Sequence, residues 1–355
     1  MTMLSKQLFQ QLIMQWFDQH GRKHLPWQKN KNPYRIWVSE IMLQQTQVST
    51  VIPYFQRFMA RFPDIKSLAL AHEDDVLHLW TGLGYYQRAR HLHKTAKIIC
   101  ESFQGHFPND LIALVSLPGI GRSTAGAILS IAFEKPAAIL DGNVKRVLTR
   151  LHGITQWPGE KETLQQLWTI AEEYTPHIRI ADYTQAIMDL GATLCIRGKP
   201  NCIACPFTKH CIAHAQGTAT HLPQAKPRKT LPVRQATLLM ILQKPHYVLL
   251  EKRSASGVWK GLWSLPEIAG IADIKSIRKA FLARFHLHIE KITLGTLFRH
   301  TFSHYHLDIL PVILNIADHS TKIMDDKQQI WYNLQHNQSV GMPAPIKTLL
   351  NQLNV

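Results

Sequence analysis

Hydrophobic residues recur at helical spacing through the N-terminal part of the chain. The first 19 residues place four apolar side chains on one face of a helix, namely Leu4, Leu8, Leu12 and Trp16. The same spacing predicts helices within residues 36–48, 117–150 and 182–194. In the stretch 117–150, a tight glycine turn separates two helices and a short loop precedes a third. We therefore predict an all-α domain over residues 1–215.

The pattern changes towards the C-terminus. Residues 216–234 are rich in Thr, Pro, Lys and Arg, have no periodicity, and are interpreted as a linker. Beyond them, short apolar runs predict strands over 236–242, 247–252 and 307–314, with one helix over 274–285. We predict that residues 235–355 form a second domain, of the α+β class. A chain of 355 residues is long enough for both domains to bury a core.

The glycine turn carries the first indication of chemistry. Gly119 and Gly121 follow Pro118, which cannot continue a helix because it lacks an N–H donor. The helix that follows would direct free N–H groups and its positive dipole end at a phosphate. Asp141 comes 22 residues after Gly119, ahead of a basic run that includes Lys145. A DNA-gripping hairpin with a carboxylate behind it suggests an enzyme acting on a nucleotide; alternatively, the turn joins two core helices and Asp141 caps one.

A second carboxylate lies in the predicted helix over 36–48. Glu40 has apolar neighbours one helical turn away, Ile36 and Leu43, which would desolvate it and raise its pKa towards the range of a general acid. Breaking an N-glycosidic bond needs an acid at the leaving base and a negative charge beside the sugar. Glu40 and Asp141 suit these two roles, and Asn143 can orient Asp141 or a water molecule.

The charge balance points to a polyanionic partner. Forty Lys and Arg against 24 Asp and Glu give a formal net charge of +16. This balance favours nucleic acid first and an anionic membrane second. No apolar run approaches membrane-spanning length, and the N-terminus lacks a signal-peptide core. We expect a cytoplasmic protein of bacterial type that works on DNA as a monomer, without a membrane.

Four of the five cysteines cluster within 17 residues, at Cys195, Cys202, Cys205 and Cys211. An odd total in a chain without an export signal argues against a disulfide framework. Four thiolates can close round one tetrahedral metal centre, and ligand type alone slightly favours zinc over an iron–sulfur cluster. The fifth, Cys100, is most simply a small buried residue.

These features resemble the helix–hairpin–helix DNA glycosylases, the superfamily of endonuclease III, and more closely the MutY adenine DNA glycosylases. The resemblance rests on the hairpin, the two carboxylates and the 6-2-5 spacing between the cysteines, and it covers almost the whole chain. It implies that the four cysteines hold a [4Fe–4S] cluster, which shapes a basic surface. It also implies that the substrate is double-stranded DNA with adenine opposite 8-oxoguanine or guanine.

The resemblance assigns further site residues. It implies that Glu40 protonates adenine and that Asp141 stabilises the sugar cation. It places four residues in the adenine pocket: Arg22, Leu25, Trp27 and Gln185. It assigns DNA contacts to Trp27, Gln28, Gln45, Thr46, Leu83, Gly84, Tyr85, Gly119, Gly121, Ser123, Lys145 and Ser303. From the residues alone, Trp27 can also be an ordinary core residue, and Gln185 can be a surface glutamine. The turn at 82–84 can be a turn before a core helix, or a mobile wedge that presents Leu83 and Tyr85 to the bases.

The second domain resembles the Nudix fold over residues 257–266 and the helix after them. Nudix hydrolases need glutamates on that helix to hold magnesium, and residues 274–285 contain no acidic side chain. The resemblance therefore implies a recognition domain. It matches residues 298–306 to the loop that reads the oxidised guanine, with Ser303 as the contact.

Ser123 separates two reaction types. In relatives of the endonuclease III type that also cut the strand, a lysine at this position attacks the sugar and forms a Schiff base; serine cannot. We expect a monofunctional glycosylase that uses water as nucleophile. Two alternatives are an endonuclease III-like glycosylase/lyase for damaged pyrimidines, and a DNA-binding or redox iron–sulfur protein in which both carboxylates are structural.

Overall fold

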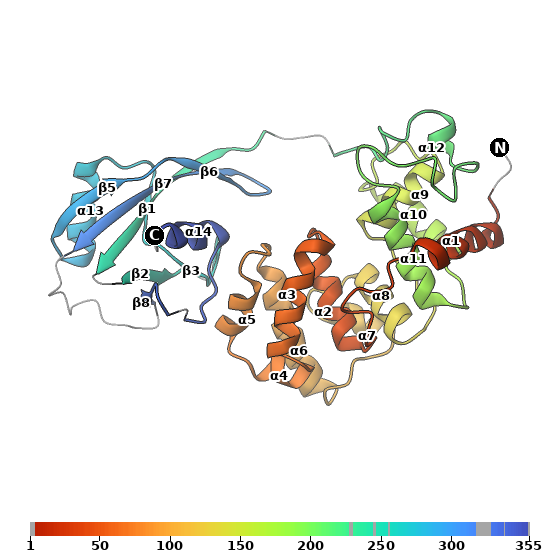
Figure 1. Ribbon diagram of the computed structural model, residues 1–355, viewed down its shortest axis with the longest axis horizontal. Coiled ribbons are helices and arrows are strands. Elements are labelled where there is room, and N and C mark those ends of the chain that lie inside the picture. Colours follow the sequence, from red (N-terminus) through yellow and green to blue (C-terminus); the bar gives the residue numbers. More distant parts are fainter. Residues whose placement is uncertain are drawn as a thin grey trace. The chain divides into compact units, whose positions relative to one another are not determined.

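A computed structural model describes residues 4–226, 230–243, 246–254, 256–316, 328–336 and 338–353. The chain divides into two compact units (Figure 1). The first comprises Met1–Leu70 and His91–Arg228, and the second comprises Ala71–Arg90 and Lys229–Val355. The second unit therefore contains a segment that the sequence pattern assigned to the helical domain. Residues 227–229 of the predicted linker lie outside the described residues.

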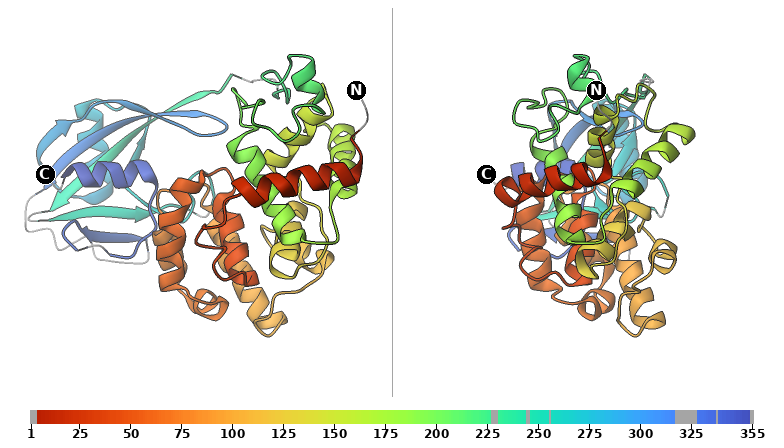
Figure 2. Two further views of the ribbon diagram at one scale, coloured as in Figure 1. Left: turned by 45° about the vertical axis from the view of Figure 1, so that its right-hand side comes forward. Right: turned by 90° about the vertical axis from the view of Figure 1, so that its right-hand side faces the viewer.

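The first unit is built from helices, as predicted. They are α1 (Lys6–His20), α2 (Pro33–Leu43), α3 (Val48–Arg61), α4 (Ile65–Leu70), most of α6 (Gln87–Ser102), α7 (Leu111–Ser116), α8 (Arg122–Ala132), α9 (Gly142–Leu151), α10 (Lys161–Tyr174), α11 (Ile180–Thr193) and α12 (Ile212–Ala215). Helix α11 is central, since it packs against α1, α8 and α9 (Figure 2). None of the described helices is long and apolar enough to cross a bilayer.

Capping residues and turns determine where the helices that carry the candidate site residues begin and end. Helix α2 begins after Asn32, whose side chain accepts a hydrogen bond from the Arg35 N–H, and Pro33 occupies its first turn. Helix α9 begins after Asp141, which caps it in the same way. The predicted helix over 36–48 ends at Leu43, and the chain turns at residues 44–46 before α3. Gln44, Gln45 and Thr46 therefore lie in a turn.

The second unit is a mixed sheet with helices, which agrees with the predicted α+β class. Its strands are β1 (Val233–Gln243), β2 (Tyr247–Lys252), β3 (Trp263–Ser264), β4 (Glu267–Ala269), β5 (Ile289–Leu294), β6 (Phe298–Thr301), β7 (His306–Ile316) and β8 (Gln329–Asn333). The main path of the sheet runs β3-β2-β1-β7-β5. Strands β1 and β7 pair in parallel, and the other pairs are antiparallel.

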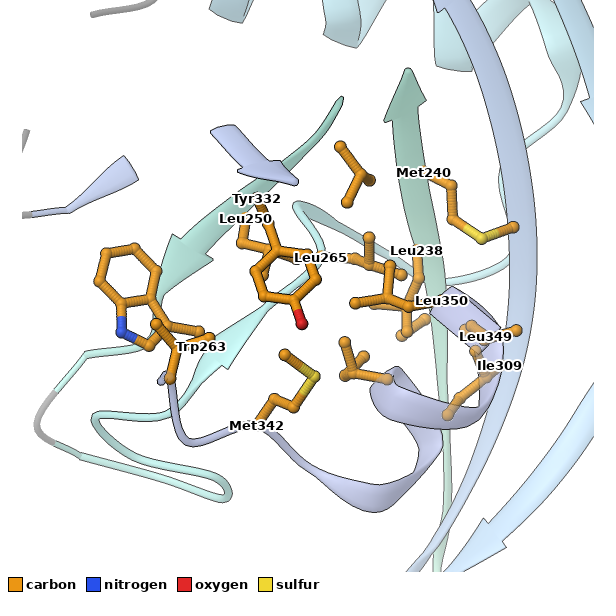
Figure 3. Close-up of a cluster of buried hydrophobic side chains, with 14 of the residues drawn as sticks. Leu238, Met240, Leu250, Trp263, Leu265, Ile309, Tyr332, Met342, Leu349 and Leu350 are labelled. Carbon is orange, nitrogen blue, oxygen red and sulfur yellow. The ribbon is translucent and has the colours of Figure 1, made fainter. Parts of the chain in front are cut away.

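Alternating side chains of β1 supply two cores on opposite faces of the sheet. Leu239 and Ile241 pack with α13 (Ile274–Phe285) on one face. Leu238 and Met240 pack with α14 (Ala344–Leu353) on the other, together with aromatic side chains such as Tyr332 (Figure 3). This two-sided burial explains why β1 appears in the sequence as an almost continuous apolar run.

The segment Ala71–Arg90 is joined to this sheet domain by side-chain contacts. Its helix α5 (Glu73–Trp80) carries Asp74, which accepts a hydrogen bond from the Lys252 ammonium group at 3.0 Å. After the helix, the Tyr86 hydroxyl donates to the Met342 carbonyl oxygen at 2.9 Å. A Cβ atom on Gly341 would lie 2.3 Å from the Leu77 Cβ, so the backbone approaches α5 as closely as glycine allows.

Candidate active site

Glu40 lines an open, polar cavity of about 280 Å³ in the first unit. Four residues that the sequence assigned to the adenine pocket or to DNA contacts line the same cavity: Arg22, Trp27, Gln28 and Gln185. Its other lining residues are Phe17, Asp18, Lys23, Lys31, Ile36, Ile131, Arg179, Ala181 and Asp182. The cavity is therefore lined by side chains from α1, the loop after it, α2, α8 and α11, and Glu40 shares it with two other acidic side chains, Asp18 and Asp182.

The surroundings of Glu40 favour its protonated form. Burial raises the pKa of Glu40 to about 8, and the charge of Asp141 adds to this shift. Glu40 therefore carries its proton at neutral pH and can donate it to a bound group. The neighbours Ile36 and Trp37, both buried, are part of the apolar surroundings that the sequence suggested.

Asp141 is held at the N-terminus of α9. Its Oδ1 accepts hydrogen bonds from the backbone N–H groups of Asn143 at 3.1 Å and Val144 at 2.8 Å. Its Oδ2 accepts one from the Asn143 side-chain amide at 3.1 Å. Burial raises the pKa of Asp141, while these hydrogen bonds and the charge of Arg146 oppose the rise. Asp141 is thus both a helix cap and an oriented carboxylate, so the two interpretations from sequence are compatible.

Arg146 ties this capped carboxylate to the cysteine-rich segment. Its Nη2 donates to the Asn143 side-chain oxygen at 2.8 Å and to the Gly191 carbonyl at 2.7 Å, and its Nε donates to the Cys195 carbonyl at 2.7 Å. A Cβ atom on Gly191 would lie 2.6 Å from the Asn143 Cβ, so α11 and the Asp141 cap are closely packed. The sequence indicated only that Arg146 belongs to a basic run.

The pocket residues Arg22 and Gln185 share one partner that sequence reasoning missed. Arg22 forms an ion pair with Asp189 of α11 at 2.6 Å, and the Gln185 side-chain amide donates to the same carboxylate at 2.8 Å. The Gln28 side chain stabilises the loop after α1, since its amide donates to the Arg22 carbonyl and its oxygen accepts from the Leu25 N–H. The only sequence signal for Asp189 is its position four residues after Gln185 on a helix.

The two apolar pocket candidates are both buried. Trp27 is 3% exposed and packs edge-on against Phe55, with ring centroids 5.4 Å apart. Because it also lines the cavity, Trp27 is a core residue with one edge at the site. Leu25 is 9% exposed and is not among the cavity-lining side chains of the described chain. The structure thus places Trp27 at the cavity, whereas the place of Leu25 in the adenine pocket stays a prediction.

The hairpin before α8 has the geometry of an open helix N-terminus. Gly119 has φ of +81°, and a Cβ atom there would lie 2.7 Å from the His91 Cβ. Gly121 is the N-cap of α8, and among the described residues no side chain caps the helix there. Ser123 accepts a hydrogen bond from the Leu140 N–H at 3.0 Å, which holds the chain just before Asp141. Lys145 follows in the first turn of α9.

The remaining DNA-contact candidates fall into two turns with different exposure. Gln45 is exposed with φ of +57°, next to Thr46. In the other turn, Tyr85 is 53% exposed with φ of +49° beside Gly84, whereas Leu83 is only 6% exposed. The turn thus exposes Tyr85 and buries Leu83, and the contact of Leu83 with DNA stays a prediction. The apolar type of Leu83 suits a buried position equally well.

Ser303 lies in the exposed turn between β6 and β7. Phe302, one residue earlier, packs its ring against Trp259 and Tyr305, so the turn is held from behind while Ser303 stays accessible. Helix α13 carries no acidic side chain over Ile274–Phe285. It therefore lacks the oxygen ligands that magnesium prefers.

The four clustered cysteines line one cavity between α9, α11 and the loop after α11. Cys195 accepts a hydrogen bond from the Arg150 guanidinium at 3.3 Å. Across the described part of the chain, no three His, Cys, Asp or Glu side chains converge closely enough to hold a single metal ion. The four thiols thus surround a common space. Cys100 lies apart, with its thiol 3.9 Å from the Ile65 carbonyl.

Comparison with known proteins relates both parts of the chain to DNA repair. Residues 38–173 match the HhH-GPD superfamily of base excision DNA repair proteins, and residues 237–352 match the NUDIX domain. The chain is 40% identical to the adenine DNA glycosylase of Buchnera aphidicola subsp. Acyrthosiphon pisum, over 98% of each chain. It is 34% identical to the human adenine DNA glycosylase, over 84% of this chain and 65% of that one. A thermostable thymine-DNA glycosylase superposes with a TM-score of 0.55 at 26% identity, covering 59% of this chain and 97% of that one.

Proposed function

The chain belongs to the adenine DNA glycosylases, enzymes of base excision repair, and we propose that it releases adenine by general acid catalysis with Glu40 as the acid. One observation carries the assignment. Glu40 lines the polar cavity, and its pKa of about 8 keeps it protonated at neutral pH. A carboxylic acid that holds its proton beside a pocket for a base can turn adenine into a leaving group.

The reaction follows from the two carboxyl groups. Glu40 gives its proton to a ring nitrogen of adenine, and the bond from the base to the sugar breaks with its electron pair leaving on adenine. The positive charge that develops on the sugar is stabilised by Asp141, which Asn143 orients. Water adds to the sugar carbon and gives a proton to the Glu40 carboxylate, which restores the acid. The products are free adenine and an abasic site.

The enzyme is proposed to be monofunctional. A lyase would need an amine that attacks the sugar and forms an iminium, and position 123 holds a serine. The Ser123 hydroxyl oxygen is engaged with the Leu140 N–H, so it supports the Asp141 loop. Lys145, in the first turn of α9, is the amine closest in sequence to Asp141 and is available only for an adventitious reaction with the abasic sugar.

The cysteine cavity is proposed to hold a [4Fe–4S] cluster. Burial raises the pKa of Cys202, Cys205 and Cys211, so these thiols need a strongly cationic centre to become thiolates. The four cysteines line one common cavity, and their 6-2-5 spacing is that of the [4Fe–4S] loop in the superfamily that the sequence resembles. The cluster would order the loop that meets Arg146 and Arg150.

The second unit is proposed to recognise the base opposite adenine, either 8-oxoguanine or guanine in duplex DNA. Ser303 is exposed at the tip of the β6–β7 turn and can bond to the group that distinguishes 8-oxoguanine. A hydrogen bond of this kind supplies about 1–3 kcal/mol. Ser303→Ala should therefore reduce the preference for 8-oxoguanine over guanine by about 5- to 150-fold.

Base release from synthetic duplexes tests the proposal. Each duplex carries one adenine opposite 8-oxoguanine, guanine, cytosine or thymine, and free adenine is measured in single turnovers. Wild-type protein should release adenine opposite 8-oxoguanine and guanine, and Glu40→Gln should bind the same duplexes without release. Glu160→Gln, an exposed position at the start of α10, is the matched control. Near-normal release by Glu40→Gln would remove Glu40 from the mechanism.

A further inference from the structure

The Tyr86 hydroxyl joins two distant segments of the second unit. It donates a hydrogen bond to the Met342 carbonyl at 2.9 Å and accepts one from the Gly82 N–H at 3.3 Å. Tyr86 itself is only 9% exposed, so its ring offers little surface to a ligand. One buried side chain therefore links the turn at residues 82–85 to the connection between β8 and α14.

The turn at residues 82–85 is held in its conformation by the side chains behind it. Gly84 and Tyr85 have φ of +71° and +49°. A tyrosine is rarely stable in this left-handed region unless its surroundings support it. The Trp80 indole and the Arg88 guanidinium both donate to the Gly84 carbonyl, each at 3.2 Å. The direction of the exposed Tyr85 ring therefore depends on contacts made behind the turn.

The C-terminal side of this link is fixed to the sheet. Met342 is buried in the core to which α14 contributes. The neighbouring Gly341 carbonyl accepts a hydrogen bond from the Trp263 N–H of β3 at 2.9 Å. Because Gly341 has no side chain, its backbone also packs directly against Leu77 of α5. The Met342 carbonyl is thus a fixed acceptor, and the Tyr86 hydroxyl ties the turn to it.

We propose that Tyr86 is a positioning residue for Tyr85, so that the sheet domain fixes the pose in which the exposed Tyr85 ring stacks against DNA bases. A ring that enters a base step gains most when it is already held in place, because a mobile side chain loses conformational freedom on binding. The inference rests on the proposed function, in which the second unit recognises the base opposite adenine. It adds a second route for that recognition, since the sheet domain then acts through the turn as well as through Ser303.

Tyr86→Phe tests this role because it keeps the ring and removes the hydroxyl. The probe is a duplex with 8-oxoguanine opposite a tetrahydrofuran abasic analogue, which carries no base to release, and with 2-aminopurine beside the 8-oxoguanine. The fluorescence of 2-aminopurine depends on its stacking, so its change on binding reports the entry of Tyr85. Tyr86→Phe should reduce this change and weaken binding about fivefold. Tyr34→Phe, which removes a hydroxyl bonded to the Phe62 carbonyl in the first unit, should alter neither.

A second substitution separates positioning from a general structural role. Tyr85→Ala should abolish the fluorescence change. If Tyr86 acts through Tyr85, adding Tyr86→Phe to Tyr85→Ala should weaken binding no further, whereas a loosened fold would weaken it by the same factor in both backgrounds. Thr81→Val removes the acceptor of the Met342 N–H, at 3.4 Å, and so loosens the same link. It should reduce the fluorescence change in the same way, and it supplies the test if Tyr86→Phe is unfolded at the assay temperature.

Each outcome decides between the two proposals. A wild-type protein that releases no adenine from a duplex with 8-oxoguanine contradicts the proposed function itself. If adenine is released, a Tyr86→Phe protein with the wild-type fluorescence change, or with equal losses of affinity in the presence and absence of the Tyr85 ring, overturns the positioning inference alone. A Tyr85→Ala protein that keeps the wild-type fluorescence change and affinity also overturns it, because the turn then places no ring in the DNA.

Discussion

The Asp141 carboxylate raises the pKa of Glu40, and its effect adds to the larger one of burial. With a pKa of about 8, Glu40 is the proton donor throughout the neutral range. The single-turnover rate of adenine release should be nearly constant from pH 6 to pH 7.5 and fall about tenfold per pH unit well above pH 8. Asp141→Asn removes the neighbouring charge, so the fall in its residual rate should begin at lower pH. A fall that starts at the same pH in both proteins would contradict the coupling.

The same shift makes a prediction about stability. Glu40 has a higher pKa in the folded protein, about 8, than its usual 4.5, so the folded state binds its proton more tightly. Ionisation of Glu40 therefore destabilises the folded state, and this destabilisation begins as the pH rises above about 4.5 and is complete above about pH 8. Glu40→Gln should therefore raise the melting temperature more at pH 9 than at pH 5. Thermal denaturation at the two pH values measures this, and an equal change at both would contradict it.

The two hairpin glycines should respond differently to alanine. Gly119 has φ of +81° and its Cβ position lies 2.7 Å from the His91 Cβ, so Gly119→Ala should destabilise the fold by about 1–3 kcal/mol. Gly121 has an ordinary φ of −86° and open space at its Cβ position. Gly121→Ala should keep the melting temperature and weaken duplex binding, because the methyl group occupies the approach of a phosphate. Binding as tight as wild type in Gly121→Ala would argue against phosphate contact there.

Ser123 should determine the fate of the DNA strand. The wild-type product should be an intact strand with an abasic site that breaks only in alkali. Ser123→Lys supplies an amine and should allow borohydride to trap a covalent protein–DNA adduct. It should also slow base release, because the Leu140 N–H loses its acceptor. Ser123→Ala is the control that loses the acceptor without gaining an amine; strand cleavage by wild type, matched one-to-one with base release, would contradict the assignment.

The cysteine cavity predicts the metal content of the protein. Purified, anaerobically prepared protein should be brown and contain about four irons per chain. Cys202→Ser should lower the iron content, the melting temperature and the affinity for DNA. Cys100→Ser is the matched control outside the cavity and should keep the iron. Stoichiometric zinc without iron in the wild-type protein would refute the cluster.

Local patterns were sufficient for much of the fold. Apolar periodicity predicted the regions that contain α1, α2, α8, α9 and α11, and the turn at Gly119 follows from residue types that cannot continue a helix. The raised pKa of Glu40 also followed from its neighbours one turn away. These features depend on residues close together in sequence, where helical spacing is a reliable guide.

The features that sequence did not predict depend on distant partners. Asp189 lies 167 positions from Arg22, and no periodicity connects a buried carboxylate to a loop at the other end of the domain. The burial of Leu83 was open for a similar reason. An apolar residue in a glycine turn suits insertion into DNA and burial equally well, and the sequence alone does not choose between them.

Residues 71–90 have a consequence for how the chain is made. In a growing chain, Tyr86 emerges 256 positions before Met342, whose carbonyl it binds. Leu77 and Tyr86 contact Gly341 and Met342, so they stay exposed to solvent until the C-terminal residues have been synthesised. The second unit is therefore the last to complete its fold. A chain cut after residue 216 would leave this segment permanently uncovered. A catalytic defect of the truncated chain would then combine two causes, the loss of base recognition and the loss of the contacts that hold residues 71–90. A single substitution such as Ser303→Ala keeps those contacts.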